Sequence, residues 1–236
     1  MSRLVLLRHG LSLGNEDHRV TGKLDLPLSQ MGIQEARRAA PLLSHFSFER
    51  AYSSFMSRAV QTKDIIYGEL GISPPTLRTG LLDSRSYGDL EGCTKQEIEA
   101  RFGAQALRKY KRGVGAESIP PNGESFESVG ERVWLLYTQF LKLDMLRDFD
   151  SLVISHGNVL AALIKRLDGL DDDAALDVYP HHCTPIVYEF KPSFGHGGPW
   201  LDITARYELL PSQADIFSNA FAGSPVSWMP QSVIQG

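Results

Sequence analysis

Two short apolar runs, each followed at once by a histidine and a glycine, constrain the fold of this chain more than any other feature. Residues 4–7 lead into Arg-His-Gly at 8–10, and residues 152–155 lead into His-Gly-Asn at 156–158. Short runs without polar alternation are typical of strands that are buried on both faces, as in a parallel sheet. We therefore expect both runs to be inner strands of an α/β sheet, with a histidine at the end of each.

Segments with helical character separate further strand-like runs. Ser29 is a candidate N-cap, Thr94 and Glu97 have capping-box spacing, and Gly71 directly follows a helical pattern. Alternating helices and strands predict an α/β fold, a three-layer sandwich in which a mostly parallel central sheet carries helices on both faces. The expected helices span residues 29–43, 58–70, 93–102, 126–140 and 159–167, and the further expected strands span residues 50–54 and 185–190.

The chain is expected to form a single domain over residues 1–236, with an irregular tail over residues 208–236 that holds three prolines. Its 28 acidic residues against 24 Lys and Arg give a net charge of −4, so no overall basic surface indicates nucleic acid. The chain lacks the apolar run of about 18 residues that a membrane span needs, and it lacks the pattern of a signal peptide. Two cysteines, Cys93 and Cys183, suit a reducing cytoplasm. A homo-oligomer remains open.

The two histidines are expected at one edge of the sheet. Ligands of open α/β sheets bind beyond the carboxyl ends of the strands, where His9 and His156 would lie. Arg58 follows another predicted strand at the start of a helix, and a guanidinium matches phosphate oxygens in a bidentate manner. Taken singly, each histidine could simply end its strand, and Arg58 could form a surface salt bridge. Together with Arg8, these residues favour a site that surrounds a phosphoryl group.

These motifs, in this order, resemble the histidine phosphatase superfamily over residues 3–190. Within that superfamily the sequence is most similar to the cofactor-dependent phosphoglycerate mutases, so the resemblance implies their fold. The substrate-binding positions that it implies are Ser12, Asn15, Thr21, Gly22, Ser84, Arg85, Tyr87, Lys95, Lys111, Arg112, Gly157 and Asn158.

The resemblance also implies a mechanism. His9 attacks the phosphorus of a small phosphorylated metabolite and becomes a phosphohistidine, which divides one difficult step into two easier ones. Arg8, Arg58 and His156 hold the phosphoryl oxygens, and a carboxylic acid protonates the leaving oxygen. No metal or organic cofactor is expected, although a mutase needs a bisphosphorylated primer such as 2,3-bisphosphoglycerate.

The sequence departs from the family at the acid. Ser84 stands where the family has its acidic residue, and a hydroxyl does not readily replace a carboxylic acid. Asp83 is the neighbouring candidate, but consecutive side chains of an extended segment point to opposite faces. Asp83 could therefore serve only if the backbone turns there. Leu11, Gly14 and Lys23 also replace residues that are common in the mutases.

Three functions remain open at this point. The first is a mutase-like phosphoryl transfer, an isomerisation, which Lys95, Lys111 and Arg112 favour because they suit a substrate with a further anionic group. The second is a phosphomonoester hydrolase of the same fold. The third is a catalytically impaired protein that binds phosphorylated metabolites, which Ser84 supports. A zinc site at His-His-Cys, residues 181–183, is disfavoured because adjacent residues lack the usual ligand spacing.

Overall fold

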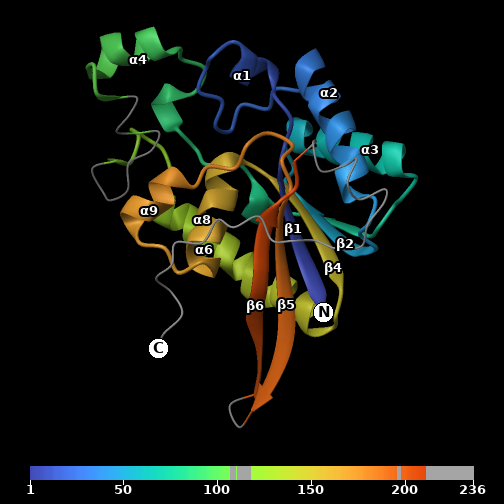
Figure 1. Ribbon diagram of the computed structural model, residues 1–236. Coiled ribbons are helices and arrows are strands. Elements are labelled where there is room, and N and C mark those ends of the chain that lie inside the picture. The colour runs from blue at the N-terminus through green and yellow to red at the C-terminus, as the bar shows by residue number, and fades with distance from the viewer. Residues whose placement is uncertain (107–109, 111–117, 196–197, 211–236) are drawn as a thin grey trace.

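The computed structural model describes residues 1–106, 110, 118–195 and 198–210, and Figure 1 shows the arrangement of the elements. The strands are β1 (Ser2–Arg8), β2 (Phe48–Ser53), β3 (Thr76–Arg78), β4 (Asp150–Ser155), β5 (Ile186–Gly195) and β6 (Gly198–Glu208). The helices are α1 (Leu13–Glu16), α2 (Gln30–Ala39), α3 (Ser57–Leu70), α4 (Lys95–Phe102), α6 (Phe126–Leu136), α7 (Lys142–Leu146), α8 (Gly157–Leu167) and α9 (Asp172–Asp177). Short 3-10 turns span Ala40–Leu43, Gly80–Leu82 and Gly88–Leu90, and a π-helical segment at Tyr137–Leu141 joins α6 to α7.

The six strands form one sheet in the order β3-β2-β4-β1-β5-β6. Strands β1 to β4 run parallel to their neighbours among themselves, whereas β5 and β6 pair in the antiparallel sense. The predicted α/β fold with a mostly parallel sheet is therefore confirmed. The two runs that define the sequence lie side by side, because β1 pairs with β4 in a register that sets Arg8 opposite Ser155.

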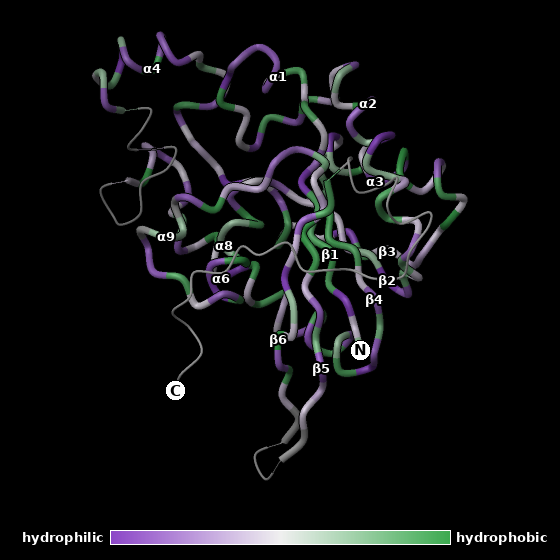
Figure 2. The backbone as a smooth tube through the Cα atoms, in the orientation of Figure 1, coloured by the Kyte–Doolittle hydropathy of each residue, from purple (hydrophilic) through white to green (hydrophobic). Residues whose placement is uncertain are grey.

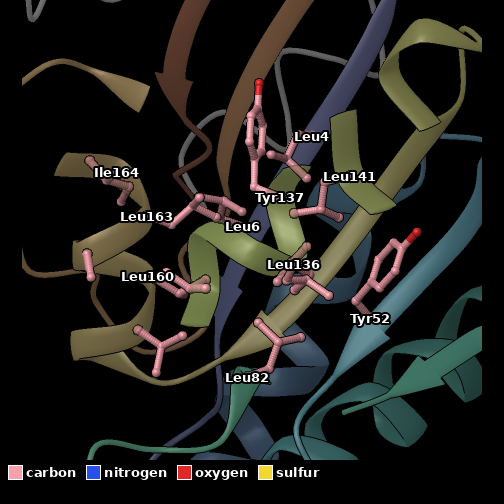
Figure 3. Packing of buried hydrophobic residues seen from close by; sticks show 14 of the residues in the cluster. Leu4, Leu6, Tyr52, Leu82, Leu136, Tyr137, Leu141, Leu160, Leu163 and Ile164 are labelled. Carbon is pink, nitrogen blue, oxygen red and sulfur yellow. The ribbon is translucent and has the colours of Figure 1, made fainter. Parts of the chain in front are cut away.

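Apolar side chains cover both faces of the inner strands. On β1, Leu4 and Leu6 pack toward α6 and α8, as Figure 3 shows, whereas Val5 and Leu7 belong to a second cluster with residues of α3. All four side chains are 0% exposed. Figure 2 shows the same apolar band along the central strands. This burial explains the uninterrupted apolar run, since a strand between two helical layers has no face for polar residues.

The predicted helix boundaries follow from local capping. Ser29 accepts a hydrogen bond from the N–H of Gly32 at the start of α2, and Thr94 and Glu97 form a capping box on α4. Gly71 ends α3 with a φ of 64°, a left-handed conformation that glycine adopts without steric cost. Asp171 caps α9 by accepting from the N–H of Ala174.

Strands β5 and β6 form a long hairpin that projects beyond the rest of the sheet (Figure 1). The sequence indicated a strand only over residues 185–190, and it did not indicate β6, which reaches Glu208. Residues 211–236 of the expected tail lie outside the described residues. Within the described part of the chain, no helix is both long enough and apolar enough to cross a membrane.

Candidate active site

His9 and His156 meet where β1 and β4 end. The N–H of His9 donates to the carbonyl of Ser155 at 3.0 Å, so the pairing of β1 with β4 continues one residue beyond the end of β1. The ring centroids of His9 and His156 are 4.9 Å apart, and the residues are 4% and 2% exposed. The sheet therefore brings both imidazoles to one place at its carboxyl edge.

His9 presents one nitrogen that is free to react. Its Nδ1–H donates to the carbonyl of Gly10 at 2.7 Å, because a carbonyl can only accept. Its Nε2 makes no hydrogen bond with the described residues and is not among their fully buried unpartnered atoms. Burial, followed by the charges of Arg58 and Arg8, holds the pKa of His9 well below its ordinary value. The ring is therefore neutral at pH 7, with a lone pair on Nε2, which is the state that a nucleophilic histidine requires.

His156 offers a buried, unpartnered nitrogen in the ring next to His9. It stands at the N-cap position of α8, and its Nε2 lies 2.9 Å from Oγ of Ser54. When the Ser54 hydroxyl donates to Nε2, Nδ1 of His156 carries the proton, yet Nδ1 is buried without a partner. Burial, then the proximity of His9 and the charge of Arg58, keeps the pKa of His156 well below its ordinary value.

Arg58 points inward from the first turn of α3 and is 1% exposed. Its guanidinium donates to the carbonyls of Leu24 and Gly22, each at 2.9 Å, and its Nε is buried without a partner. Burial lowers the pKa of Arg58 to about 10, against the raising effects of Asp25 and Asp83, so the group stays charged at pH 7. A buried cation with an unused donor is costly unless an anion occupies the space beside it.

Arg8 is the second cation. Its guanidinium donates to the carbonyl of Pro180 at 3.0 Å and lies 4.8 Å from the ring centroid of Tyr179. Among the described residues, four buried side-chain nitrogens have no hydrogen-bond partner, and three of them belong to this cluster: Nε of Arg8, Nε of Arg58 and Nδ1 of His156. Buried donors are nearly always satisfied. Three unpartnered buried nitrogens, in the cluster that also holds the free Nε2 of His9, therefore suit a tetrahedral oxyanion bound to His9.

The glycines beside the two histidines act through packing. A Cβ on Gly10 would lie 2.5 Å from the carbonyl oxygen of Gly32, and a Cβ on Gly157 would lie 2.5 Å from the ring of Tyr179. Close approach to neighbouring protein groups thus suffices to explain both glycines. Tyr179, which packs on Gly157, is also the ring that faces Arg8.

Ser84 stands where the resemblance implies an acidic residue, and Asp83 is the carboxylate next to it. Ser84 is 9% exposed. Asp83 follows the 3-10 turn Gly80–Leu82 and is itself extended, with φ −63° and ψ 152°. One of its oxygens accepts from the N–H of Phe55 at 3.0 Å, and the other lies 3.7 Å from Nζ of Lys23. The Asp83 carboxylate therefore faces the loop before α3, close enough to Arg58 to raise the pKa of that guanidinium.

Several substrate-binding positions implied by the resemblance contact one another, and Gly22 contacts Arg58. Ser12 is buried and caps α1, and its hydroxyl bonds Asn15 at 2.9 Å. Gly22 follows Thr21 with a φ of 49°, and its carbonyl holds Arg58. Next to Gly157, the amide of Asn158 donates to the hydroxyl of Tyr87 at 2.5 Å.

The cationic residues that the resemblance implies as substrate-binding contact other parts of the protein where the structure describes them. Arg85 is 1% exposed and donates to the carbonyls of Glu124 at 2.8 Å and Ser118 at 3.3 Å, so it holds the 118–124 loop. The side chain of Lys95 is 63% exposed and pairs with Glu99 one turn along α4. Lys111 and Arg112 lie outside the described residues.

His182 is the residue that sequence reasoning missed. Its Nδ1–H donates to the carbonyl of His9 at 2.7 Å, and the two ring centroids are 5.4 Å apart. A short parallel bridge between Arg8 and His182 brings it there, although the residues are far apart in sequence. The only sequence signal is a histidine just before a strand that pairs with β1. Within the described residues no group of three or more His, Cys, Asp or Glu is arranged to hold a metal ion.

Comparison with known proteins agrees with this arrangement. The histidine phosphatase superfamily (branch 1) matches residues 4–196. A 2,3-bisphosphoglycerate-dependent phosphoglycerate mutase of Brucella canis is 38% identical over 195 residues, which cover 81% of this chain and 94% of the mutase. A mutase of the same description from Cytophaga hutchinsonii is 33% identical over 191 residues, which cover 81% of this chain and 89% of that mutase.

Solved structures show the same fold. A mycobacterial glucosyl-3-phosphoglycerate phosphatase, crystallised with VO3, superposes with a TM-score of 0.71 at 23% identity and covers 86% of this chain and 97% of its own. At that identity the likeness concerns the fold alone. The family match and the identity to the mutases carry the assignment: the chain belongs to the histidine phosphatase superfamily, a family of enzymes.

Proposed function

We propose that this protein transfers a phosphoryl group from a small phosphorylated metabolite through a phosphohistidine at His9, in the manner of a phosphoglycerate mutase. The observation that carries the proposal is the set of three unpartnered buried nitrogens, on Arg8, Arg58 and His156, in the cluster that holds the free Nε2 of His9. Such donors stabilise charge on the equatorial oxygens while the phosphoryl group moves.

The chemistry follows from that geometry. Nε2 of neutral His9 forms a bond to phosphorus, and the bond from phosphorus to the ester oxygen breaks. The leaving oxygen takes up a proton and departs as an alcohol. In the second half, a hydroxyl group attacks the phosphohistidine and His9 returns to its neutral state. The two cations do not need to be protonated or moved at any step, so the site is organised in advance.

The acceptor in the second half distinguishes a mutase from a hydrolase. The identity to the mutases supports isomerisation. A mutase would be primed by a bisphosphorylated compound such as 2,3-bisphosphoglycerate. The donors of Arg8, Arg58 and His156 suit one of its phosphates, which would supply the phosphoryl group that His9 carries.

Hydrolysis is the second candidate, and one observation favours it. Arg85 is bound to backbone carbonyls, and Lys95 is paired with Glu99 on α4. These contacts engage both cations within the protein and make them less available to a further anionic group of the substrate. A protein that only binds phosphorylated metabolites would have no need of the accessible, neutral Nε2 of His9.

One experiment tests the proposal. The protein is incubated with a set of phosphomonoesters, with and without 2,3-bisphosphoglycerate, and released phosphate and isomerised product are followed separately. Mass spectrometry at alkaline pH locates the adduct. We expect an acid-labile phosphoryl group on His9 that is lost in His9→Ala. An undiminished adduct in His9→Ala would place the nucleophile elsewhere, and no adduct or turnover with any ester would leave a binding protein.

A further inference from the structure

The site lacks an evident proton donor for the leaving oxygen. Ser84 occupies the expected position, and its hydroxyl has too high a pKa for the task. Three carboxylates lie near enough to raise the pKa of Arg58, namely Asp25, Asp83 and Glu91. Each of these carboxylates accepts hydrogen bonds from nearby loops.

These carboxylates are already engaged by donors. Asp25 accepts from the N–H and the hydroxyl of Ser57 at the start of α3, at 2.7 and 2.8 Å. Asp83 accepts from the N–H of Phe55 and lies beside Lys23. Both carboxylates therefore hold the loop before α3 in place.

Glu91 is the most heavily bound of the three. Its Oε1 accepts from the N–H groups of Lys23 and Tyr87, at 3.0 and 2.8 Å, and from the hydroxyl of Ser86 at 3.3 Å. It therefore ties the loop that contains Gly22 to the loop that contains Tyr87. Its removal would disturb both loops, so the carboxyl is better explained as a structural tie than as an acid.

His182 differs from all of these because one of its nitrogens is free. Nδ1 is fixed by its hydrogen bond to the carbonyl of His9, and Nε2 has no partner among the described residues. Nε2 is also absent from their fully buried unpartnered atoms, in a residue that is partly exposed, so solvent can reach it. The nucleophile and His182 thus present two free Nε2 atoms on rings whose centroids are 5.4 Å apart.

The surroundings of His182 set its charge. Burial, then the charge of Arg8, lowers its pKa to about 4, His181 adds to this effect, and the hydrogen bond to the His9 carbonyl opposes it. The ring is therefore neutral at pH 7 before substrate binds. A phosphate dianion placed beside Arg8 offsets the charge of that cation and favours protonated His182.

We propose that Nε2 of His182 carries the proton that the leaving oxygen takes up, a task for which Ser84 has no carboxylic acid. The proposal rests on phosphoryl transfer through His9. A phosphomonoester releases its second proton with a pKa of about 6, so much of it is present near neutrality as the monoanion. Neutral His182 takes that proton from the bound phosphate, and the resulting imidazolium donates it to the leaving oxygen as the bond to phosphorus breaks.

The same nitrogen serves the second half. His182 is neutral again once the alcohol has left, and its Nε2 takes the proton of the water or hydroxyl group that attacks the phosphohistidine. The bond from His9 Nε2 to phosphorus then breaks, and His9 leaves as a neutral ring without needing a proton. The proton on His182 returns to the phosphate product. Every proton is thus accounted for by the substrate and one imidazole.

A matched set of variants separates proton transfer by Nε2 of His182 from the hydrogen bond by which its Nδ1 holds the His9 carbonyl. His182→Asn places an amide near the position of Nδ1, so it keeps a donor for the His9 carbonyl but removes Nε2. His182→Ala removes both. His181→Asn, at the exposed neighbour, is the control. The substrates are an alkyl ester, glycerol phosphate, and an aryl ester, 4-nitrophenyl phosphate, whose leaving group needs little protonation.

We expect His182→Asn to lower kcat on the alkyl ester by about 100-fold or more, since general acid–base catalysis contributes ~100 to 10,000-fold. The aryl ester should still phosphorylate His9 at nearly the wild-type rate, while decay of the phosphohistidine slows. His181→Asn keeps both nitrogens of His182 and should leave the ratio of the two phosphorylation rates unchanged. An equal loss in the rate of His9 phosphorylation by the two esters, or a wild-type ratio of those two rates in His182→Asn, would overturn the role of His182. Wild-type protein without a phosphohistidine would instead refute the proposed function itself.

Discussion

Gly32 of α2 packs against the loop that follows His9, and this contact offers a sharp test of how the fold supports the site. Gly32 lies in the first turn of α2, where an added Cβ would lie 2.0 Å from the carbonyl oxygen and 2.8 Å from the nitrogen of Leu11. Both are backbone atoms. The same Leu11 carbonyl accepts from the N–H of Ser29, and the Leu11 N–H donates to Glu35 at 2.7 Å.

Gly32→Ala should therefore destabilise the protein and displace the loop after His9. Overpacking in a core costs about 1–3 kcal/mol, and losing one of the Leu11 hydrogen bonds adds about 1 kcal/mol. Alanine recovers about 1 kcal/mol through its helix propensity. The net loss is about 1–3 kcal/mol, which corresponds to a fall in Tm of about 2–12 °C for a chain of this size.

Gly68→Ala is the matched control. Gly68 lies on α3, is exposed, and an added Cβ there would meet no atom within 4 Å. The substitution should stabilise the protein by about 0.5–1 kcal/mol. Differential scanning calorimetry measures both changes, and the rate of phosphohistidine formation reports on the loop. A Gly32→Ala protein with wild-type Tm and wild-type rate would refute the reasoning, as would a destabilised Gly68→Ala protein.

Three further outcomes are expected. Ser84→Glu should raise turnover of alkyl phosphates more than of aryl phosphates, whereas Asp83→Asn should change their ratio little; a selective loss of alkyl turnover in Asp83→Asn would instead make Asp83 the acid. The pKa values of His9, His156 and His182 are lowered on folding, so the unfolded chain binds more protons than the folded protein below pH 6.5. Tm should therefore fall as the pH drops from 6.5 toward 4. A Tm that rises over that range contradicts the burial of neutral imidazoles. Inorganic phosphate should raise Tm in proportion to RT ln(1 + [phosphate]/Kd), and Arg58→Gln should remove most of that shift if the unsatisfied Nε is a phosphate donor.

The sequence predicted the features that depend on local patterns. The apolar runs 4–7 and 152–155 mark strands that are buried on both faces, and the caps at Ser29 and Thr94 follow from side chains that bond the backbone a few residues away. The convergence of His9 and His156 could be anticipated because parallel neighbouring strands end at the same edge. No long-range contact needed to be known for any of these.

The remainder depends on contacts that have no local signature. His182 reaches His9 across 173 residues of sequence, through a strand order that places β5 beside β1. The resemblance implied that Arg85 contacts substrate, and in this structure its Nε and Nη2 donate to the carbonyls of Glu124 and Ser118. Which carbonyls surround a guanidinium is decided by the path of the 118–124 loop, and composition or periodicity does not encode that path.

Burial and the charge of Arg8 explain why the proposed proton carrier, His182, is a neutral imidazole before substrate binds. Burial and the charge of Arg8 act together to lower the pKa values of His9, His156 and His182, so the free enzyme holds three neutral rings beside two cations. That state favours attack by Nε2 of His9 and provides no proton donor. A bound phosphomonoester monoanion offsets the cations and brings its own proton to His182, and the dianion that remains favours the protonated ring. Proton supply then depends on substrate binding, since the same Arg8 that holds the phosphate keeps His182 neutral in its absence.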